Sequence, residues 1–173
     1  LPEAELDRFL MKLLVVYPQP VEELDIVKNS LPLAANNEKP APLSPVLKRE
    51  ALTFLRQTAD SVHIDEEITK YIVSIITATR PAAGLSHEHL RTKAEGVYRY
   101  VSFGASPRAS IALYRCSRIF AMFQGRAFVT PEDVKTAALP VIRHRIVLSY
   151  EAEAEGMDTD SVISRILNHV PIP

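Results

Sequence analysis

The sequence predicts a mainly α-helical fold, in which a helical bundle follows a helix–strand–helix fragment of an α/β layer. At three places a Ser-Pro or Thr-Pro pair, which is typical of a helix start, precedes apolar residues at helical spacing. One apolar run, residues 11–16, has the length and composition of a strand buried on both faces. Residues 31–43, which hold three prolines and two asparagines, are typical of a linker.

The composition favours a globular protein and argues against several other classes. Of the 173 residues 47% are hydrophobic, so a packed core is expected, and the net charge of -1 does not suggest a nucleic-acid surface. No apolar run approaches the ~20 residues that span a bilayer. The single cysteine, Cys116, excludes an internal disulfide and fits a reducing, cytoplasmic location. Because the chain begins at Leu1 without an initiator Met, we expect it to be part of a longer protein.

The first 30 residues predict the α/β fragment. A proline and acidic residues at the start suit the first turn of a helix that ends near Phe9. The strand of residues 11–16 follows, and residues 22–28 form a short helix. A lone strand leaves its backbone groups unpaired, and no second run of comparable quality lies nearby. We therefore expect residues 1–30 to be a piece of an α/β core whose other strands lie outside this chain, and residues 44–173 to be a separate helical domain.

The helical domain is predicted to begin at Ser44 and Pro45, the first cap-and-proline pair. Residues 62–64 form a short extended piece, and Asp65 caps the next helix. That helix carries a strong amphipathic stripe and ends before Pro81. The residues of the stripe recur at intervals of three and four: Ile68, Tyr71, Ile72, Ile75, Ile76 and Thr79.

A short strand and another helix are predicted next. Residues 97–103 alternate in the manner of a strand. Ser106 and Pro107 start a helix that continues to Gln124, where a glycine stops it. One face of this helix is apolar: Ala112, Leu113, Cys116, Ile119, Phe120 and Phe123.

The last part of the sequence predicts two more helices. Thr130 and a proline start the first, which runs to about Leu139 and is kinked or restarted by Pro140. Residues 146–148 are extended, and residues 158–169 form a closing helix. The inward face of the closing helix consists of Val162, Ile163, Ile166 and Leu167.

Two arginines are candidates for contact with an anion. Arg108 lies in the first turn of the helix that Ser106 caps, where a cation opposes the helix dipole by about 0.3–1 kcal/mol. A guanidinium group there is explained if phosphate oxygens lie close by, because its planar fork binds them in pairs. Arg8 follows Asp7 just before the predicted strand. For both arginines an ordinary surface position remains open as the alternative.

Other candidate residues have simpler structural explanations. His87 and His89 have a weak metal-binding spacing without a third ligand nearby in the sequence, so no metal site is predicted. Residues 143–145, Arg-His-Arg, suit the favourable charge of a helix C-terminus. Cys116 lies on an apolar helix face and is expected to be a core residue.

The sequence lacks the phosphate-binding loop Gly-x4-Gly-Lys-Ser/Thr. None of the five glycines is followed by a lysine. That loop supplies a cradle of backbone amides and a lysine for the phosphates. Without it, the chain alone is not expected to hold a nucleoside triphosphate.

Several segments, in the same order along the chain, resemble the MoxR family of AAA+ ATPases. Residues 1–9, Leu-Pro-Glu-Ala-Glu-Leu-Asp-Arg-Phe, are similar to the family's Leu-Pro-Glu-Ala-x-Leu-Asp-Arg-Phe segment. Other segments look like the family's lid signatures: Thr79-Arg80, residues 104–109, 125–134, 141–146 and 170–173. The resemblance implies an AAA+ lid-type helical bundle behind the end of the nucleotide-binding core. Residues 86–95 depart from the family pattern as extra polar sequence.

The resemblance assigns roles to the two arginines. Arg108 matches the second sensor, which reaches the γ-phosphate of ATP bound by the same subunit. Arg8 matches the arginine finger, which reaches nucleotide held by the neighbouring subunit of a homo-oligomeric ring, and Asp7 is expected to orient it. An arginine supplied in trans is worth up to about 10³–10⁵ in rate in well-studied nucleotidases.

The resemblance also implies a function for the longer protein. The intact parent is expected to bind ATP and Mg²⁺ and to hydrolyse ATP to remodel or assemble partners, in a chaperone-like manner, with a von Willebrand factor A-domain protein among them. This chain alone is expected to be inactive and to bind no cofactor. A non-enzymatic helical interaction domain is the alternative, and it predicts that the strand finds its sheet within the chain. A nucleic-acid-binding bundle is a weaker option, because the net charge of -1 does not suggest a basic face.

Overall fold

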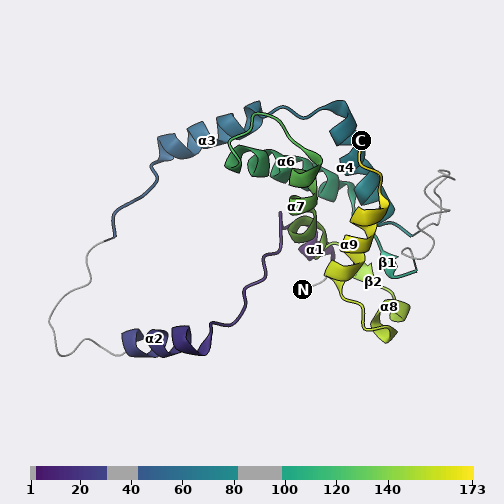
Figure 1. Cartoon of the computed structure of the whole chain (residues 1–173), viewed down its shortest axis with the longest axis horizontal. Coiled ribbons are helices and arrows are strands. Elements are labelled where there is room, and N and C mark those ends of the chain that lie inside the picture. Colours follow the sequence, from purple (N-terminus) through teal and green to yellow (C-terminus); the bar gives the residue numbers. More distant parts are fainter. Residues whose placement is uncertain (1–2, 31–42, 82–98) are drawn as a thin grey trace.

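The computed structural model describes residues 3–30, 43–81 and 99–173. Four helices form the body of the fold, and Figure 1 shows them gathered together at one side of the chain. Contacts join α6 to α7, α4 to α6, and α7 to α9. The four helices are α4 (Glu66–Ala78), α6 (Pro107–Phe123), α7 (Pro131–Ile142) and α9 (Thr159–His169). The predicted mainly helical bundle is therefore confirmed.

The described residues form further helices outside this four-helix body. The helix at the start of the chain ends earlier than predicted, at Leu6 rather than near Phe9, and the segment continues as turns. A short helix between the last two predicted elements was not expected from the sequence. These elements are α1 (Glu3–Leu6), α2 (Pro20–Ser30), α3 (Arg49–Ser61) and α8 (Tyr150–Ala154).

Two short extended pairings tie loops of the bundle together. Strand β1 (Val101–Phe103) pairs antiparallel with β2 (Val147–Leu148). His63 forms an isolated parallel bridge with Phe128. These positions confirm the predicted extended pieces at residues 62–64 and 146–148. The predicted strand at 97–103 is confirmed for its last three residues, and its first two lie outside the described part of the chain.

Side-chain caps start the bundle helices where the sequence predicts. The Asp65 carboxylate accepts a hydrogen bond from the Glu67 amide at 2.9 Å at the start of α4. At the start of α7, Asp133 accepts from the Thr130 amide at 2.8 Å as part of a capping box. The predicted start at Ser106 is also confirmed.

The start of α3 differs from the prediction. The helix begins at Arg49 rather than at Ser44 and Pro45, and Lys48 precedes it without a side-chain cap. The residues before the helix make little packing contact with the rest of the protein, since Val46 is 96% exposed. A helical turn without packing does not offset the entropy that its nucleation costs.

The core lies among α4, α6, α7 and α9. The predicted stripe of α4 is confirmed, with Ile75 and Ile76 fully buried. The predicted face of α6 is wrong in its last turns, because Ile119 is 39% exposed and Phe123 is 72% exposed. There the helix buries the small residue Ala121, and α7 likewise buries alanines. Small side chains allow the two helix backbones to approach closely.

Helix α7 was predicted to run to about Leu139, with a kink or restart at Pro140 that continues to Arg145. It forms one element that continues through Pro140 and ends at Ile142. A proline has no N–H, so the carbonyl of Thr136 loses its usual helical donor. Thr136 lies on an exposed face of the helix, where water can replace that donor.

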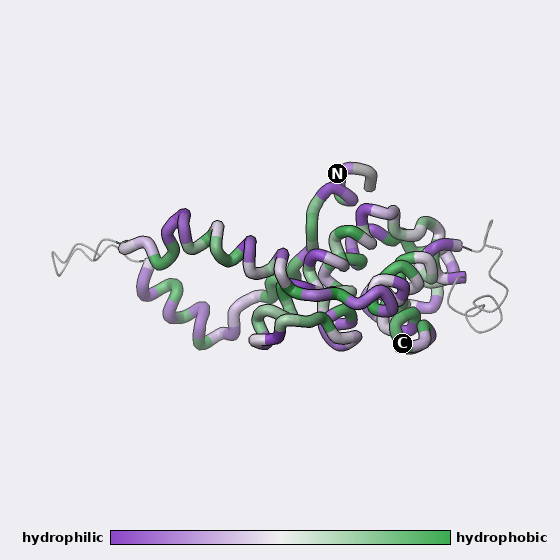
Figure 2. The backbone as a smooth tube through the Cα atoms, turned by 90° about the horizontal axis from the view of Figure 1, so that it is seen from above, coloured by the Kyte–Doolittle hydropathy of each residue, from purple (hydrophilic) through white to green (hydrophobic). Residues whose placement is uncertain are grey.

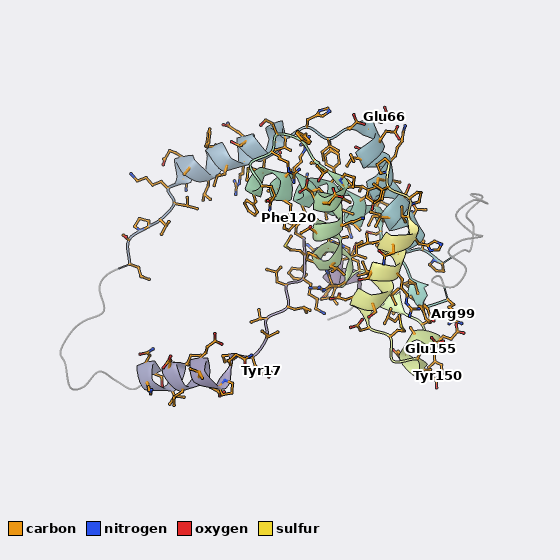
Figure 3. All side chains as sticks on the ribbon, viewed as in Figure 1. Tyr17, Glu66, Arg99, Phe120, Tyr150 and Glu155 are labelled. Carbon is orange, nitrogen blue, oxygen red and sulfur yellow. The ribbon has the colours of Figure 1, made fainter. Side chains whose placement is uncertain are left out.

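The predicted strand at residues 11–16 does not form. The stretch has an extended course, but the side chains of Leu13 and Val15 are 70% and 94% exposed. Figure 3 shows Tyr17 where this stretch leads to α2, away from the bundle. A strand needs a neighbouring strand for its backbone hydrogen bonds, and no strand within the described ranges pairs with these residues; the amide of Lys12 bonds the end of α7 instead.

Helices α2 and α3 extend away from the bundle body. Figure 2 shows hydrophobic and hydrophilic turns alternating along them. Helix α2 has no buried residue, and Ala59 is the only residue that α3 buries. Of the predicted linker, residues 31–42 lie outside the described part of the chain. Among the helices that the structure describes, none combines the length and the apolar character needed to cross a membrane.

Substitutions on α4 test the assigned core. Ile76→Ala is expected to lower the free energy of unfolding by about 2–5 kcal/mol, because it leaves a cavity in the close-packed core. Val73, on the same helix, is 49% exposed. Val73→Ala is therefore expected to cost less than about 1 kcal/mol. Urea denaturation followed by circular dichroism measures both, and equal losses would contradict the assigned helix face.

Candidate functional site

Arg145, just after α7, holds the extended stretch at the start of the chain. Its side chain is 3% exposed. Its guanidinium donates to the carbonyl of Phe9 at 2.6 Å, to that of Leu10 at 3.1 Å and to that of Asp7 at 3.3 Å. Its Nε also donates to the Asp7 carboxylate at 3.2 Å. One buried cation therefore fixes the backbone on both sides of Arg8.

Two neighbours of Arg145 bind the same stretch. Arg143 donates to the carbonyl of Lys12 at 3.0 Å and forms a two-point ion pair with Asp160 at 3.0 and 2.7 Å. His144 Nε2 lies 3.0 Å from the carbonyl of Phe9, so this nitrogen carries the proton. The Arg-His-Arg triplet thus fastens residues 7–12, in addition to suiting the charge of a helix end.

The C-terminal carbonyls of α7 all find donors in this arrangement. The last four carbonyls of a helix have no donor within it and need partners from outside. Backbone amides serve the first and last of them, from Arg143 at 3.1 Å and from Arg145 at 2.8 Å. Pro140 O accepts from the Lys12 amide at 2.8 Å, and Val141 O accepts from the Arg145 side chain. The N-terminal stretch is therefore part of how α7 ends.

The start of α6 is held against the end of α4. Gly104 passes so close that a Cβ there would lie 2.5 Å from both the Arg80 Cα and the Thr79 carbonyl. The buried Thr79 hydroxyl accepts from the Ala105 amide at 2.9 Å and donates to the Ile76 carbonyl at 2.7 Å. Arg80 Nε donates to the Ala105 carbonyl at 3.0 Å. These contacts place the N-terminus of α6 and hence Arg108.

Asp7 lies at this helix N-terminus. The Ser106 hydroxyl lies 3.1 and 3.0 Å from its two oxygens, and Arg108 Nη1 donates to Oδ2 at 3.1 Å. The side chain of Asp7 is 17% exposed, whereas that of Arg108 is 66% exposed. The partial positive charge of a helix N-terminus favours an anion at such a place.

The charge of Asp7 is stabilised by these partners. Burial raises the pKa of Asp7, but hydrogen bonds from Ser106 and Arg108 and the charge of Arg145 outweigh burial and bring the pKa below 3.8. Burial lowers the pKa of Arg145, and the charge of Asp7 opposes that effect. The two groups therefore support each other as an ion pair.

The structure brings the two predicted arginines to one hollow of about 200 Å³. Arg8 and Arg108 both line it, and both are exposed. Asp7 binds Ser106, Arg108 and Arg145, so the expected contact between Asp7 and Arg8 side chains is not among its bonds. The other residues that line the hollow are Asp7, Leu10, Ile111, Ala112, Arg115 and Arg145.

Two other candidates are settled differently. Cys116 is 3% exposed and belongs to the core cluster, as predicted. Burial raises the pKa of its thiol, and the charge of Arg145 only partly opposes this. A buried neutral thiol is a poor nucleophile. His87 and His89 lie outside the described residues.

Sequence reasoning missed Arg145 as the centre of the site. Its position after a helix suggested only a favourable charge. The available signal was its place next to Ile142 and Ile146, which are both buried: a charged residue close to core residues needs a partner. Ser106 was recognised as a cap, but its contact with Asp7, 99 positions away, was not recognised.

Comparison with known proteins identifies the class of the helical part. Residues 93–166 match the family model of the AAA lid domain. The crystal structure of a candidate ATPase from Cytophaga hutchinsonii superposes with a TM-score of 0.81 at 35% identity. It covers 100% of this chain, which in turn covers 49% of that structure. The helical bundle therefore has an AAA+ lid-type fold.

Sequence relatives define the family further. The chain is 34% identical over its whole length to the chaperone MoxR1 of Mycobacterium tuberculosis, of which it covers 42%. It is also 34% identical over its whole length to the uncharacterized protein YeaC of Bacillus subtilis, of which it covers 48%. Along its whole length the chain is therefore similar to proteins of the MoxR family, and it spans about half the length of the curated relatives it matches.

The Asp7 ion pairs predict a loss of stability in acid. Because the pKa of Asp7 is lowered in the folded chain, its contribution to stability is present above the pKa of an unfolded aspartate and is lost as pH falls through the lowered pKa. Asp7→Asn is therefore expected to be less stable than the wild type near pH 6, and this difference is expected to close in acid, as the Asp7 carboxylate of the wild type becomes protonated. Urea midpoints measured from pH 6 downward follow the difference. A difference that does not change with pH would contradict the assigned charge interactions.

Proposed function

We propose that this chain supplies the lid and two phosphate-contacting arginines of an ATPase that hydrolyses ATP to remodel or assemble partner proteins. The observation that supports this most directly is the placement of Arg8 and Arg108 around one hollow beside the N-terminus of α6. Exposed guanidinium groups at such a place suit the oxygens of a transferred phosphoryl group. The name of the relative MoxR1 as a chaperone agrees with the remodelling role.

Arg108 is the proposed second sensor, which contacts the γ-phosphate of ATP in the same subunit. It uses one N–H on Asp7, and its side chain is 66% exposed, so other donors of its fork remain for phosphate. Arg8 is the proposed arginine finger, which contacts nucleotide of the neighbouring subunit. Its exposed side chain lies on a backbone that Arg145 holds in place.

The rest of the nucleotide site is proposed to lie in the other half of the longer protein. The sequence lacks a Gly-rich loop with lysine to cradle phosphates. Among the described residues, no three His, Cys, Asp or Glu side chains group to bind a metal ion. In this proposal ATP and Mg²⁺ are held by the other half of the longer protein, and ATP supplies the phosphoryl group. On its own this chain has no ATPase activity.

We also propose a division of the chain into three parts. Residues 1–30 belong to the α/β nucleotide-binding core, 31–43 link it to the lid, and 44–173 form the lid. The exposed apolar side chains of residues 13–16 support the first assignment, because a strand inside a sheet would cover them.

The proposed assembly is a cytoplasmic homo-oligomeric ring. The proposed finger Arg8 acts in trans on a neighbour's nucleotide, so a ring of subunits follows from this role. The partners are neighbouring subunits and a von Willebrand factor A-domain protein. Nucleic acid is not a proposed partner, because the net charge is -1.

One observation favours a second candidate function, a non-enzymatic protein-interaction domain. A groove of about 750 Å³ lies among α3, α4 and α6, and apolar residues such as Ile72, Val73 and Ile119 contribute to its lining. Exposed apolar surface of this kind is typical of interaction sites. The lid role is preferred, because this alternative predicts a sheet closed within the chain and residues 11–16 form none in the described part.

Arginine substitutions in the full-length protein test the proposed roles. Arg8→Ala is expected to lower the ATPase kcat at least about a hundredfold, because the transition-state charge loses its trans cation. Arg108→Ala is expected to lower kcat/KM about tenfold or more. Arg49, an exposed arginine on α3 outside the hollow, provides the matched control. Wild-type activity in both Arg8→Ala and Arg108→Ala would refute the proposal.

Hydrogen exchange tests the proposed division. Backbone amides of residues 13–17 are expected to exchange rapidly in this chain alone, because the stretch is extended and exposed. In the full-length protein they are expected to be protected at least about a hundredfold by pairing in a sheet. Mass spectrometry of the exchanged peptides compares the two, with the α4 peptide as internal control. Equal exchange in both forms would rule out the strand assignment.

A further inference from the structure

One buried side chain holds both functional arginines by separate routes. The first route runs through the backbone. Arg145 binds the carbonyl of Asp7 at 3.3 Å and that of Phe9 at 2.6 Å, on either side of Arg8. The course of the chain through Arg8 is thereby fixed, while the side chain of Arg8 remains exposed.

The second route runs through the Asp7 carboxylate. Arg145 Nε donates to Oδ1 at 3.2 Å, and Arg108 Nη1 donates to Oδ2 at 3.1 Å. The Ser106 hydroxyl lies within 3.1 Å of both oxygens. One carboxylate therefore bridges a buried guanidinium, 3% exposed, and a freely accessible one, 66% exposed.

The bond between Asp7 and Arg108 suits a role in which Asp7 positions the guanidinium group better than one in which Asp7 competes with phosphate for it. Arg108 has five N–H donors, and its bond to Asp7 occupies one of them. Asp7 cannot readily leave, because its departure would strand the Arg145 charge in a buried place. Asp7 thus orients Arg108 and leaves most of its fork for a ligand.

We propose that Asp7, anchored by Arg145, is a positioning residue that sets Arg8 and Arg108 relative to each other. The inference rests on the proposed function, in which the two arginines serve two nucleotides. Because one ion pair holds both, a shift of the lid at one nucleotide is passed to the arginine that faces the other. Asp7 itself does not touch the reacting phosphate.

The test compares two carboxylate substitutions in the full-length ATPase. Asp7→Asn keeps the shape but removes the charge, and it is expected to lower kcat about tenfold while KM changes less than about threefold. Asp133→Asn is the matched control. It breaks the two-point pair with Arg126, at 2.7 and 2.6 Å, at the other end of α7, and Asp133 has no bond to Arg8 or Arg108. Its kcat is expected to stay within about twofold of the wild type.

Double substitution separates positioning from general damage. In an Arg108→Ala background, Asp7→Asn is expected to lower kcat by less than the tenfold that it costs in the wild type, because one of the two arginines that it positions is already gone. A reduced loss is likewise expected in an Arg8→Lys background. An undiminished tenfold loss in both backgrounds, or equal effects of Asp7→Asn and Asp133→Asn in the wild type, would overturn the inference.

The outcomes distinguish this inference from the proposed function. If Arg8→Ala and Arg108→Ala lower activity but Asp7→Asn does not, only the positioning role fails. If neither arginine substitution lowers activity, the proposed function itself fails. Should Asp7→Asn not fold, Ser106→Ala replaces it, since it removes the hydroxyl that Asp7 binds and keeps the charge. A kcat loss in Ser106→Ala that persists unchanged in the Arg108→Ala background would equally overturn the inference.

Discussion

The ion pair between Arg145 and Asp7 decides how the N-terminal stretch meets the helical bundle. Its partners lie 138 positions apart in the sequence, so the pair joins the start of the described chain to the end of α7. A buried guanidinium that loses its carboxylate costs roughly 3–5 kcal/mol, and this makes the contact hard to abandon. The hydrogen bonds of Lys12, Arg143 and His144 depend on it, because they require residues 7–12 to lie along the end of α7.

The same pair gives the candidate site its geometry. The N-terminus of α6 is placed from one side by Thr79 and Arg80, and from the other by Asp7. The contacts of Thr79 and Arg80 are with Ala105, and the contact of Asp7 is with Arg108 itself. The side chain of Arg108 nevertheless stays exposed. Rigid support beneath an accessible cation is the arrangement that favours recognition of a phosphoryl group, since little reorganisation is needed when the ligand binds.

Local signals predicted much of the fold, and long-range contacts account for the rest. The cap at Asp65 and the stripe on α4 depend on neighbouring residues, so periodicity was sufficient to find them. The end of α7 depends on Lys12, which no sequence window around Pro140 contains. The candidate arginines could be named from the sequence, but their common hollow could not, because it requires segments about a hundred positions apart to meet.

The buried hydroxyl of Thr79 restricts which side chains evolution can place there. It accepts one hydrogen bond and donates another, so a serine keeps both, whereas a valine keeps the shape and leaves the Ala105 amide without an acceptor. The neighbouring Gly104 has no room for a larger residue either. Only a few amino acids are therefore tolerated at these two positions, even if the surrounding surface varies widely.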